Sequence, residues 1–153
     1  GFELEFGLVW RTPGTVLDTV GINAAPRGSW SVAVEAAGTI TFSVYDPRAA
    51  SRVKTANGWH VLRSRTAVPR GTEAVVRVVR SRNGLYQLFV NDSLEAQAII
   101  PVTLSGKPLY VGDYPGDAQW APRFPTDRGF VGSFELYYFG PARAAAGSGG
   151  GRR

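Results

Sequence analysis

The sequence predicts an all-β fold, in which an antiparallel sandwich is built from two sheets. Three observations support this. Apolar and polar residues alternate with a period of two over short stretches, helical periodicity is nearly absent, and turn-forming pairs separate the stretches. About ten short strands divided by turn signals, without helices, are typical of such a sandwich.

The expected strands follow from this alternation. The segment FELEFGLVW (2–10) alternates Phe and Leu with Glu and Gly, as a half-buried strand does, and Pro13-Gly14 then interrupts it. The segment Gly58–Ser64 gives a weaker signal, which favours an edge strand. The other strands are expected at Thr15–Gly21, Trp30–Ala36, Thr39–Tyr45, Glu73–Arg82, Leu85–Val90, Ser93–Ile100, Leu109–Gly112 and Phe130–Phe139.

Polar pairs between these strands are interpreted as turns and not as a chemical site. A two-residue hairpin loop needs positive φ at both central residues, and Asn-Gly adopts that conformation at little cost. The sequence therefore predicts such a loop at Asn83-Gly84, a similar one at Asn91-Asp92, and a connection across Ala37-Gly38.

Length and composition set the limits of the fold. The chain of 153 residues fits one domain that buries roughly 70% of its unfolded surface. It has no cysteine, which excludes disulfides and thiolate metal sites. No apolar run approaches the roughly 20 residues that span a bilayer, so no membrane insertion is expected.

The chain divides into a folded domain over residues 1–140 and a flexible Gly/Ser/Arg tail or linker over 141–153. It opens directly into strand-like sequence, without an initiator Met or a signal peptide. We therefore expect a domain excised from a longer or processed precursor.

Several segments, in their order along the chain, carry a resemblance to a known group. Their motifs are FELEFGL (2–8), LYQLFVNDSLEA (85–96, with Asp92 where Gly is usual), PLYVG (108–112) and FVGSFE (130–135). With these motifs the chain resembles the laminin-G-like or concanavalin A-like jelly-roll domains. The resemblance implies a jelly-roll sandwich and a binding module of an extracellular, cell-surface or virion-surface protein.

Some proteins of this superfamily are glycoside hydrolases, which need two carboxyl groups about 5.5 Å apart in the retaining case. The resemblance implies an E-x-D-x-x-E strand for that chemistry, and the nearest approach is Glu3-Leu4-Glu5, which lacks a third acid. We expect Glu3 and Glu5 to face solvent. Glu35 stands in a lectin-like strand but lacks the aspartate that would bind metal.

His60 is the only histidine. A histidine-based zinc cluster or a Cys-His pair is therefore excluded. No G-x-S-x-G elbow supports a Ser-His-Asp triad, and we expect a partly exposed strand histidine. The sequence thus predicts a protein that is not an enzyme.

The segment 112–129, GDYPGDAQWAPRFPTDRG, is long for a strand connection, and such loops tend to be functional. Aspartate oxygens suit calcium, while aromatic rings and arginine suit sugars and their carboxylates. The predicted ligand-binding residues are Tyr114, Asp117, Trp120 and Arg123, and the predicted calcium ligands are Asp113 and Asp127. The alternative is a proline-rich cover in which Trp120 and Phe124 plug the end of the sandwich.

The predicted function is non-catalytic binding of carbohydrate, with calcium as the one cofactor considered. A structural or adhesion domain of a surface layer, fibre or capsid is the first alternative, with a protein partner. The net charge of +5 leaves polyanion or nucleic-acid binding as the second, although nucleic acid is not the expected partner. The arginines that could form the basic stripe are Arg63, Arg65, Arg70, Arg77, Arg80 and Arg82.

Overall fold

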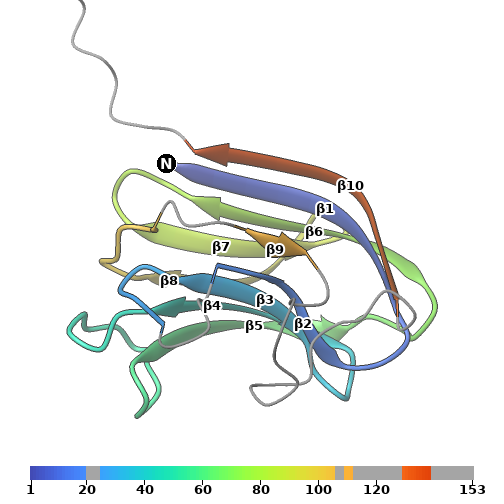
Figure 1. The fold of residues 1–153 in the computed structure, drawn as a ribbon, viewed down its shortest axis with the longest axis horizontal. Coiled ribbons are helices and arrows are strands. Elements are labelled where there is room, and N and C mark those ends of the chain that lie inside the picture. The colour runs from blue at the N-terminus through green and yellow to red at the C-terminus, as the bar shows by residue number, and fades with distance from the viewer. Residues whose placement is uncertain (20–24, 106–108, 112–128, 139–153) are drawn as a thin grey trace, which may run out of the picture.

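The computed structural model describes residues 1–19, 25–105, 109–111 and 129–138. Within these ranges the chain forms ten strands in two five-stranded antiparallel sheets and no helix. The prediction of an all-β antiparallel two-sheet sandwich is confirmed. Figure 1 shows the two layers, with the first and last strands side by side at one edge.

Sheet A has the strand order β10-β1-β6-β7-β8. Its strands are β1 (Phe2–Trp10), β6 (Glu73–Arg80), β7 (Leu85–Val90), β8 (Ser93–Ile99) and β10 (Gly129–Tyr138). Sheet B has the order β5-β4-β3-β2-β9. Its strands are β2 (Gly14–Asp18), β3 (Trp30–Val34), β4 (Thr39–Tyr45), β5 (Trp59–Ala67) and β9 (Tyr110–Val111).

Every predicted strand is present, and three of them have the predicted bounds, Phe2–Trp10, Thr39–Tyr45 and Leu85–Val90. The predicted edge strand is β5, which lies at one end of sheet B but extends to Ala67. The prediction that residues 1–140 form the domain and 141–153 a tail falls on residues beyond Tyr138, which lie outside the described ranges.

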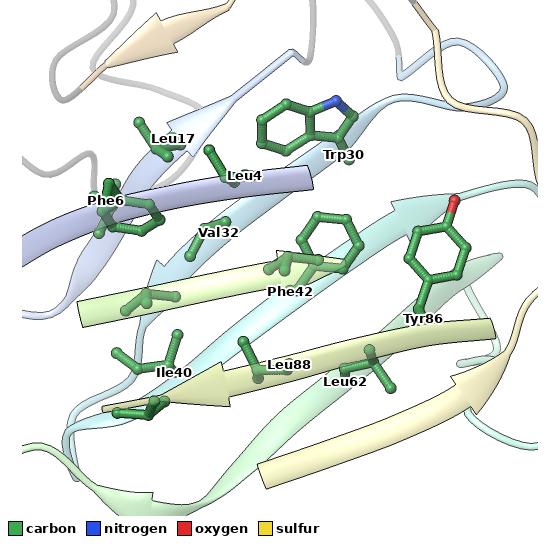
Figure 2. Packing of buried hydrophobic residues seen from close by; sticks show 14 of the residues in the cluster. Leu4, Phe6, Leu17, Trp30, Val32, Ile40, Phe42, Leu62, Tyr86 and Leu88 are labelled. Carbon is green, nitrogen blue, oxygen red and sulfur yellow. The ribbon is translucent and has the colours of Figure 1, made fainter. Parts of the chain in front are cut away.

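The core lies between the sheets, because alternate side chains of each strand point inward. Along β1 the apolar Phe and Leu positions are buried, and Trp30 and Phe42 supply the facing side of sheet B. An aromatic cluster occupies the centre, with ring centroids 5.4 Å apart for Phe2 and Trp30, 6.0 Å for Trp30 and Phe42, and 5.7 Å for Phe42 and Tyr86. Figure 2 shows Trp30, Phe42 and Tyr86 of this cluster with Leu4, Leu62 and Leu88 around them.

The two polar hairpin turns differ from each other. Asn91 and Asp92 both have positive φ, 49° and 63°, so the predicted two-residue loop is confirmed there. At Asn83-Gly84 the prediction is wrong, because only Gly84 has positive φ, at 82°. The N–H of Gly84 donates to Ser81 O, and the N–H of Ser81 donates to Leu85 O, so the loop has three residues and ends in a left-handed glycine.

A buried carboxylate ties the edges of the two sheets together. Glu95 of β8 is 7% exposed, and its Oε2 accepts hydrogen bonds from the N–H groups of Arg65 and Thr66 in β5, at 2.9 and 2.8 Å. Its Oε1 accepts from the Thr66 hydroxyl at 3.0 Å. These bonds, above all the one from the Thr66 main chain, lower the pKa of Glu95 against the effect of burial.

Replacement of Glu95 by glutamine tests this contact. Because the folded-state pKa lies below the unfolded value, the carboxylate stabilises the fold above about pH 4.3. This stabilisation is lost as the pH falls through the lowered folded-state pKa. We expect Glu95→Gln to reduce the free energy of unfolding by about 1–3 kcal/mol at neutral pH, measured by denaturant titration, with the difference vanishing in acid.

The exposed Glu73→Gln, which also removes one negative charge, is the control and should change stability little at neutral pH. A Glu95→Gln deficit that stays constant from neutral pH into acid would contradict the role of the ionised carboxylate.

Candidate functional site

The predicted site residues in the 112–129 loop lie outside the described residues. These residues are Tyr114, Asp117, Trp120 and Arg123, with Asp113 and Asp127 as the predicted calcium ligands. The strands at the two ends of the loop are described. Val111 pairs with Leu17 at the end of sheet B, and Gly129 pairs with Trp10 at the end of sheet A. The calcium site therefore stays a prediction.

A second surface carries the features of a sugar site, the outer face of sheet B. Each strand of this sheet turns alternate residues away from the core, as the half-buried classes of Ser31, Ser43 and Val61 show. The strand register places outward residues in rows across the sheet. The rows are Tyr45 and Trp59; Asp18, Ser31, Ser43 and Val61; and Thr15, Ala33, Thr41 and Arg63.

The first row forms an aromatic corner. Tyr45 and Trp59 are cross-strand partners with ring centroids 5.2 Å apart and planes tilted by 52°. Both rings are half-buried, so part of each faces solvent. Residues two apart on a strand are about 7 Å apart, so the hydroxyl of Ser43 lies one row from these rings. An apolar face beside hydroxyl groups is the arrangement that a sugar ring needs.

The third row ends in an ion pair. The guanidinium of Arg63 donates to both carboxylate oxygens of Glu35, at 2.8 and 2.7 Å, and Thr39 donates to Oε2 at 2.6 Å. The Arg63 hydrogen bond is the main cause that lowers the pKa of Glu35. The Arg63 side chain stays 56% exposed. Because the guanidinium of Arg63 binds the carboxylate of Glu35, the two charges largely offset each other. This end of the face is therefore polar but carries little net charge.

The side chain of Asp46 accepts hydrogen bonds that hold the backbone directly after Tyr45 in place. Arg27 donates to its Oδ2 at 2.9 and 3.1 Å, and the N–H groups of Arg48 and Ala49 donate to Oδ1. The pKa of Asp46 is lowered, chiefly by the Arg27 hydrogen bond. These contacts hold the start of the 46–58 segment beside the aromatic corner.

The expectation of a partly exposed His60 is wrong, because the imidazole is fully buried. Its Nε2 lies 2.9 Å from the main-chain oxygen of Asp46, an acceptor only, so Nε2–H donates there. Nδ1 forms a hydrogen bond with the Ser51 hydroxyl at 2.6 Å. Both nitrogens thus fasten the 46–58 segment onto β5, and the segment in turn covers the ring.

The carboxylates considered for hydrolysis and metal binding do not form one group, because Glu3 and Glu5 lie on a different sheet from the strand that precedes Glu35. Glu3 and Glu5 are on the outer face of sheet A, where Glu5 is exposed, Glu3 is half-buried, and Glu5 lies 3.8 Å from Arg77. Glu35 directly follows β3 of sheet B. Among the described residues, no group of three or more His, Cys, Asp or Glu side chains could hold a metal ion.

The arginines form no single stripe within the described residues. Arg63 and Arg65 lie on β5, whereas Arg77 and Arg80 lie on β6 of the other sheet. Three guanidinium groups lie over aromatic rings instead: Arg70 over Trp10 at 5.2 Å, Arg77 over Phe89 at 4.3 Å, and Arg80 over Tyr86 at 5.6 Å. Among the residues that the structure describes, no helix is long and apolar enough to cross a membrane.

Sequence reasoning did not single out Tyr45 and Trp59 as candidate site residues. Part of the signal was available, because Tyr45 ends the strand expected at Thr39–Tyr45 and Trp59 lies near the start of the strand expected at Gly58–Ser64. Their pairing, however, depends on the register between β4 and β5, which the residue pattern does not specify.

No family model matches the sequence, and no curated protein does either. Solved structures do match. The CBM40 module of the Ruminococcus gnavus IT-sialidase superposes with a TM-score of 0.60 at 14% identity, covering 89% of this chain and 74% of that one. The same module bound to α2,3-sialyllactose gives 0.58.

A native heptameric SAP-like pentraxin from Limulus polyphemus superposes with a TM-score of 0.52 at 11% identity, covering 88% of this chain and 62% of that one. These likenesses concern the fold. The two antiparallel sheets and the agreement with these sandwiches establish that the chain has a jelly-roll fold of the concanavalin A-like kind.

Proposed function

We propose that this chain is a non-catalytic carbohydrate-binding module and that the outer face of sheet B contributes to the glycan site. The observation that carries the proposal is the Tyr45–Trp59 corner beside a row of hydroxyl-bearing side chains. The apolar side of a pyranose ring can stack on an indole or phenol ring, while its hydroxyls exchange hydrogen bonds with Ser31 and Ser43.

The face has room for more than one sugar unit. From the aromatic row to the Arg63 row, the strand rise gives about 13 Å. The row between these two ends carries Ser31 and Ser43, whose small side chains offer hydroxyl groups. A short oligosaccharide lying along β4 could therefore contact the aromatic corner at one end and the Arg63–Glu35 pair at the other.

The 112–129 loop is the second part of the proposed site. It continues from β9, which pairs with β2 at the end of sheet B. Tyr114, Asp117, Trp120 and Arg123 are proposed to contact the glycan from that side, and Asp113 with Asp127 to bind calcium.

The structural likeness supports the proposal at the level of the fold. The CBM40 module of the R. gnavus sialidase binds α2,3- and α2,6-sialyllactose on a comparable sandwich. Because one fold hosts many functions, the proposal rests on the residues of this chain. A glycan-binding role also fits an extracellular or cell-surface location, which we propose with it.

Trp59→Ala tests the proposed site. Loss of the indole should weaken glycan binding about tenfold or more, equivalent to about 1.4 kcal/mol or more. Stability should fall by only about 1–2 kcal/mol, because the ring is half-buried. The measurement is a glycan array on the wild type, followed by calorimetric titration of the best ligand against the variant.

Phe89→Ala is the matched control, since it removes a half-buried aromatic ring from the outer face of sheet A. It should leave glycan affinity unchanged. Repeating the array with a calcium chelator tests the proposed roles of Asp113 and Asp127 separately. Equal affinities of wild type and Trp59→Ala for every bound glycan would remove this face from the site, and an array without any bound glycan would refute the proposed function.

A further inference from the structure

Within the ranges that the structure describes, no further strand pairs with one edge of the sandwich. β8 is the last strand of sheet A. The N–H of Ile100 donates to Gly84 O at 3.0 Å, and bonding pairs alternate along an antiparallel ladder. The pairs Tyr86–Ala98 and Leu88–Ala96 therefore exchange the bonds with β7. The main-chain N–H and C=O groups of Gln97 and Ile99 consequently point away from the sheet.

The neighbouring edge, β5 of sheet B, is covered along most of its length. At its start, the N–H of Val61 donates to Val53 O at 3.0 Å, and the N–H of Thr55 donates to Trp59 O at 2.6 Å. At its end, Glu95 accepts from the Arg65 and Thr66 N–H groups. On the remainder of β5, the exposed charged side chains of Arg63 and Arg65 disfavour pairing with a further strand.

Within the described part of the chain, no hydrogen bond or ion pair of this kind covers the rest of β8. The stretch Ala96–Ile99 contains no charge and no proline, and its register with β7 is regular. Edge strands usually avoid pairing by such devices. Ile99 is also 64% exposed, the largest value among the large apolar side chains that the structure describes. An uncharged, regular edge beside an exposed isoleucine is suited to adding a further strand.

We propose that a second copy of this chain adds to the β8 edge, so that two antiparallel β8 strands join the A sheets of a symmetric dimer. Gln97 of each copy then lies opposite Ile99 of the other, and all four outward main-chain groups of each stretch gain partners. The Arg65 guanidinium donates to Leu94 O at 2.7 Å. This contact occupies the start of β8, so pairing is centred on the open end, at Ala98.

Charge favours a second copy over an unrelated strand. Asp92 lies in the turn before β8, whereas Arg82 lies in the β6–β7 turn, at the opposite end of the strand. Antiparallel pairing brings the Asp92 end of each copy to the Arg82 end of the other, so opposite charges share each end of the joined sheet. The contact is isologous and closes on itself, because the same patch serves both partners.

The test is the mass of the full chain in solution, measured by sedimentation equilibrium over a wide concentration range. The wild type should show a monomer–dimer equilibrium. Ile99→Lys, which adds the charge that natural edges carry, should raise the dimer dissociation constant by about tenfold or more. Gln97→Pro removes one outward N–H without breaking a bond to β7, and should act in the same direction.

Val75→Lys is the matched control. Val75 is 40% exposed on the outer face of sheet A but lies on β6, away from the edge. The control should dimerise like the wild type, and circular dichroism should show all variants folded. In the wild type, the amides of Gln97 and Ile99 should exchange with solvent more slowly as the concentration rises.

Three results would overturn the proposal. The first is a wild type that stays monomeric throughout, and the second is a dimer in which these two amides gain no protection. The third is a dimer that Val75→Lys disrupts and Ile99→Lys does not, which would assign the contact to the outer face. Glycan affinity does not enter the measurement, so its outcome is independent of the proposed function.

Discussion

Phe42→Ala is expected to lower the free energy of unfolding by about 3–5 kcal/mol, the usual cost of truncating a fully buried aromatic side chain. The Phe42 ring is completely buried at the centre of the core and lies near three other rings, those of Phe2, Trp30 and Tyr86. Phe2 and Tyr86 belong to sheet A and Trp30 to sheet B, so none of these rings can move into the space without losing its own contacts. Denaturant titration at neutral pH measures the loss.

Phe89→Ala controls for the chemistry of the substitution. The Phe89 ring is half-buried on the outer face of sheet A and has Arg77 above it at 4.3 Å. Its removal should cost about 1–2 kcal/mol, because little apolar area returns to water. If the two variants lose the same stability, the aromatic cluster is not the centre of the core.

Gly38→Ala should destabilise the fold by about 3 kcal/mol or more, through two separate effects. Gly38 has φ of +88°, a left-handed conformation that costs other residues about 1–2 kcal/mol. In addition, a Cβ at this position would lie 2.4 Å from the main-chain oxygen of Val68 and 2.8 Å from the Trp10 ring. That oxygen already accepts from Trp10 Nε1 at 2.9 Å, so the clash would also break a buried hydrogen bond.

Gly71→Ala separates the two effects. Gly71 has φ of +76°, but a Cβ there would meet nothing within 4 Å. It should therefore lose only the conformational part, about 1–2 kcal/mol, in the same thermal or denaturant unfolding experiment. Equal losses for the two alanine variants would show that the contact with Val68 and Trp10 relaxes without cost.

The layered fold could be predicted because its signal is local. Each strand of an open sandwich buries one face, so alternate residues must be apolar, as in the first strand over residues 2–10. The central hairpin is bounded by turn residues on both sides, and β7 accordingly has the predicted bounds. These patterns repeat on every strand, and a small error at one strand end leaves the class of fold unchanged.

The turn at Asn83-Gly84 shows where local reasoning fails. Asn-Gly favours a two-residue loop, but loop length follows from the register that the flanking strands adopt when they pack. Here the Ser81 to Leu85 contact closes a longer loop, and only Gly84 takes a left-handed conformation. Asn91-Asp92, a weaker signal in sequence, forms the two-residue loop because Val90 and Ser93 are paired.

The candidate site was less predictable, because its residues come together only across strands. The sequence by itself determined the strand order along the chain and the inward faces, since each depends on neighbours within a few residues. The tertiary structure alone decided that Tyr45 meets Trp59, that the 46–58 segment buries His60, and that Glu95 joins two sheet edges. Each of these contacts joins residues that are distant in the chain or on different strands, and strand register and sheet packing, which no local pattern encodes, bring them together.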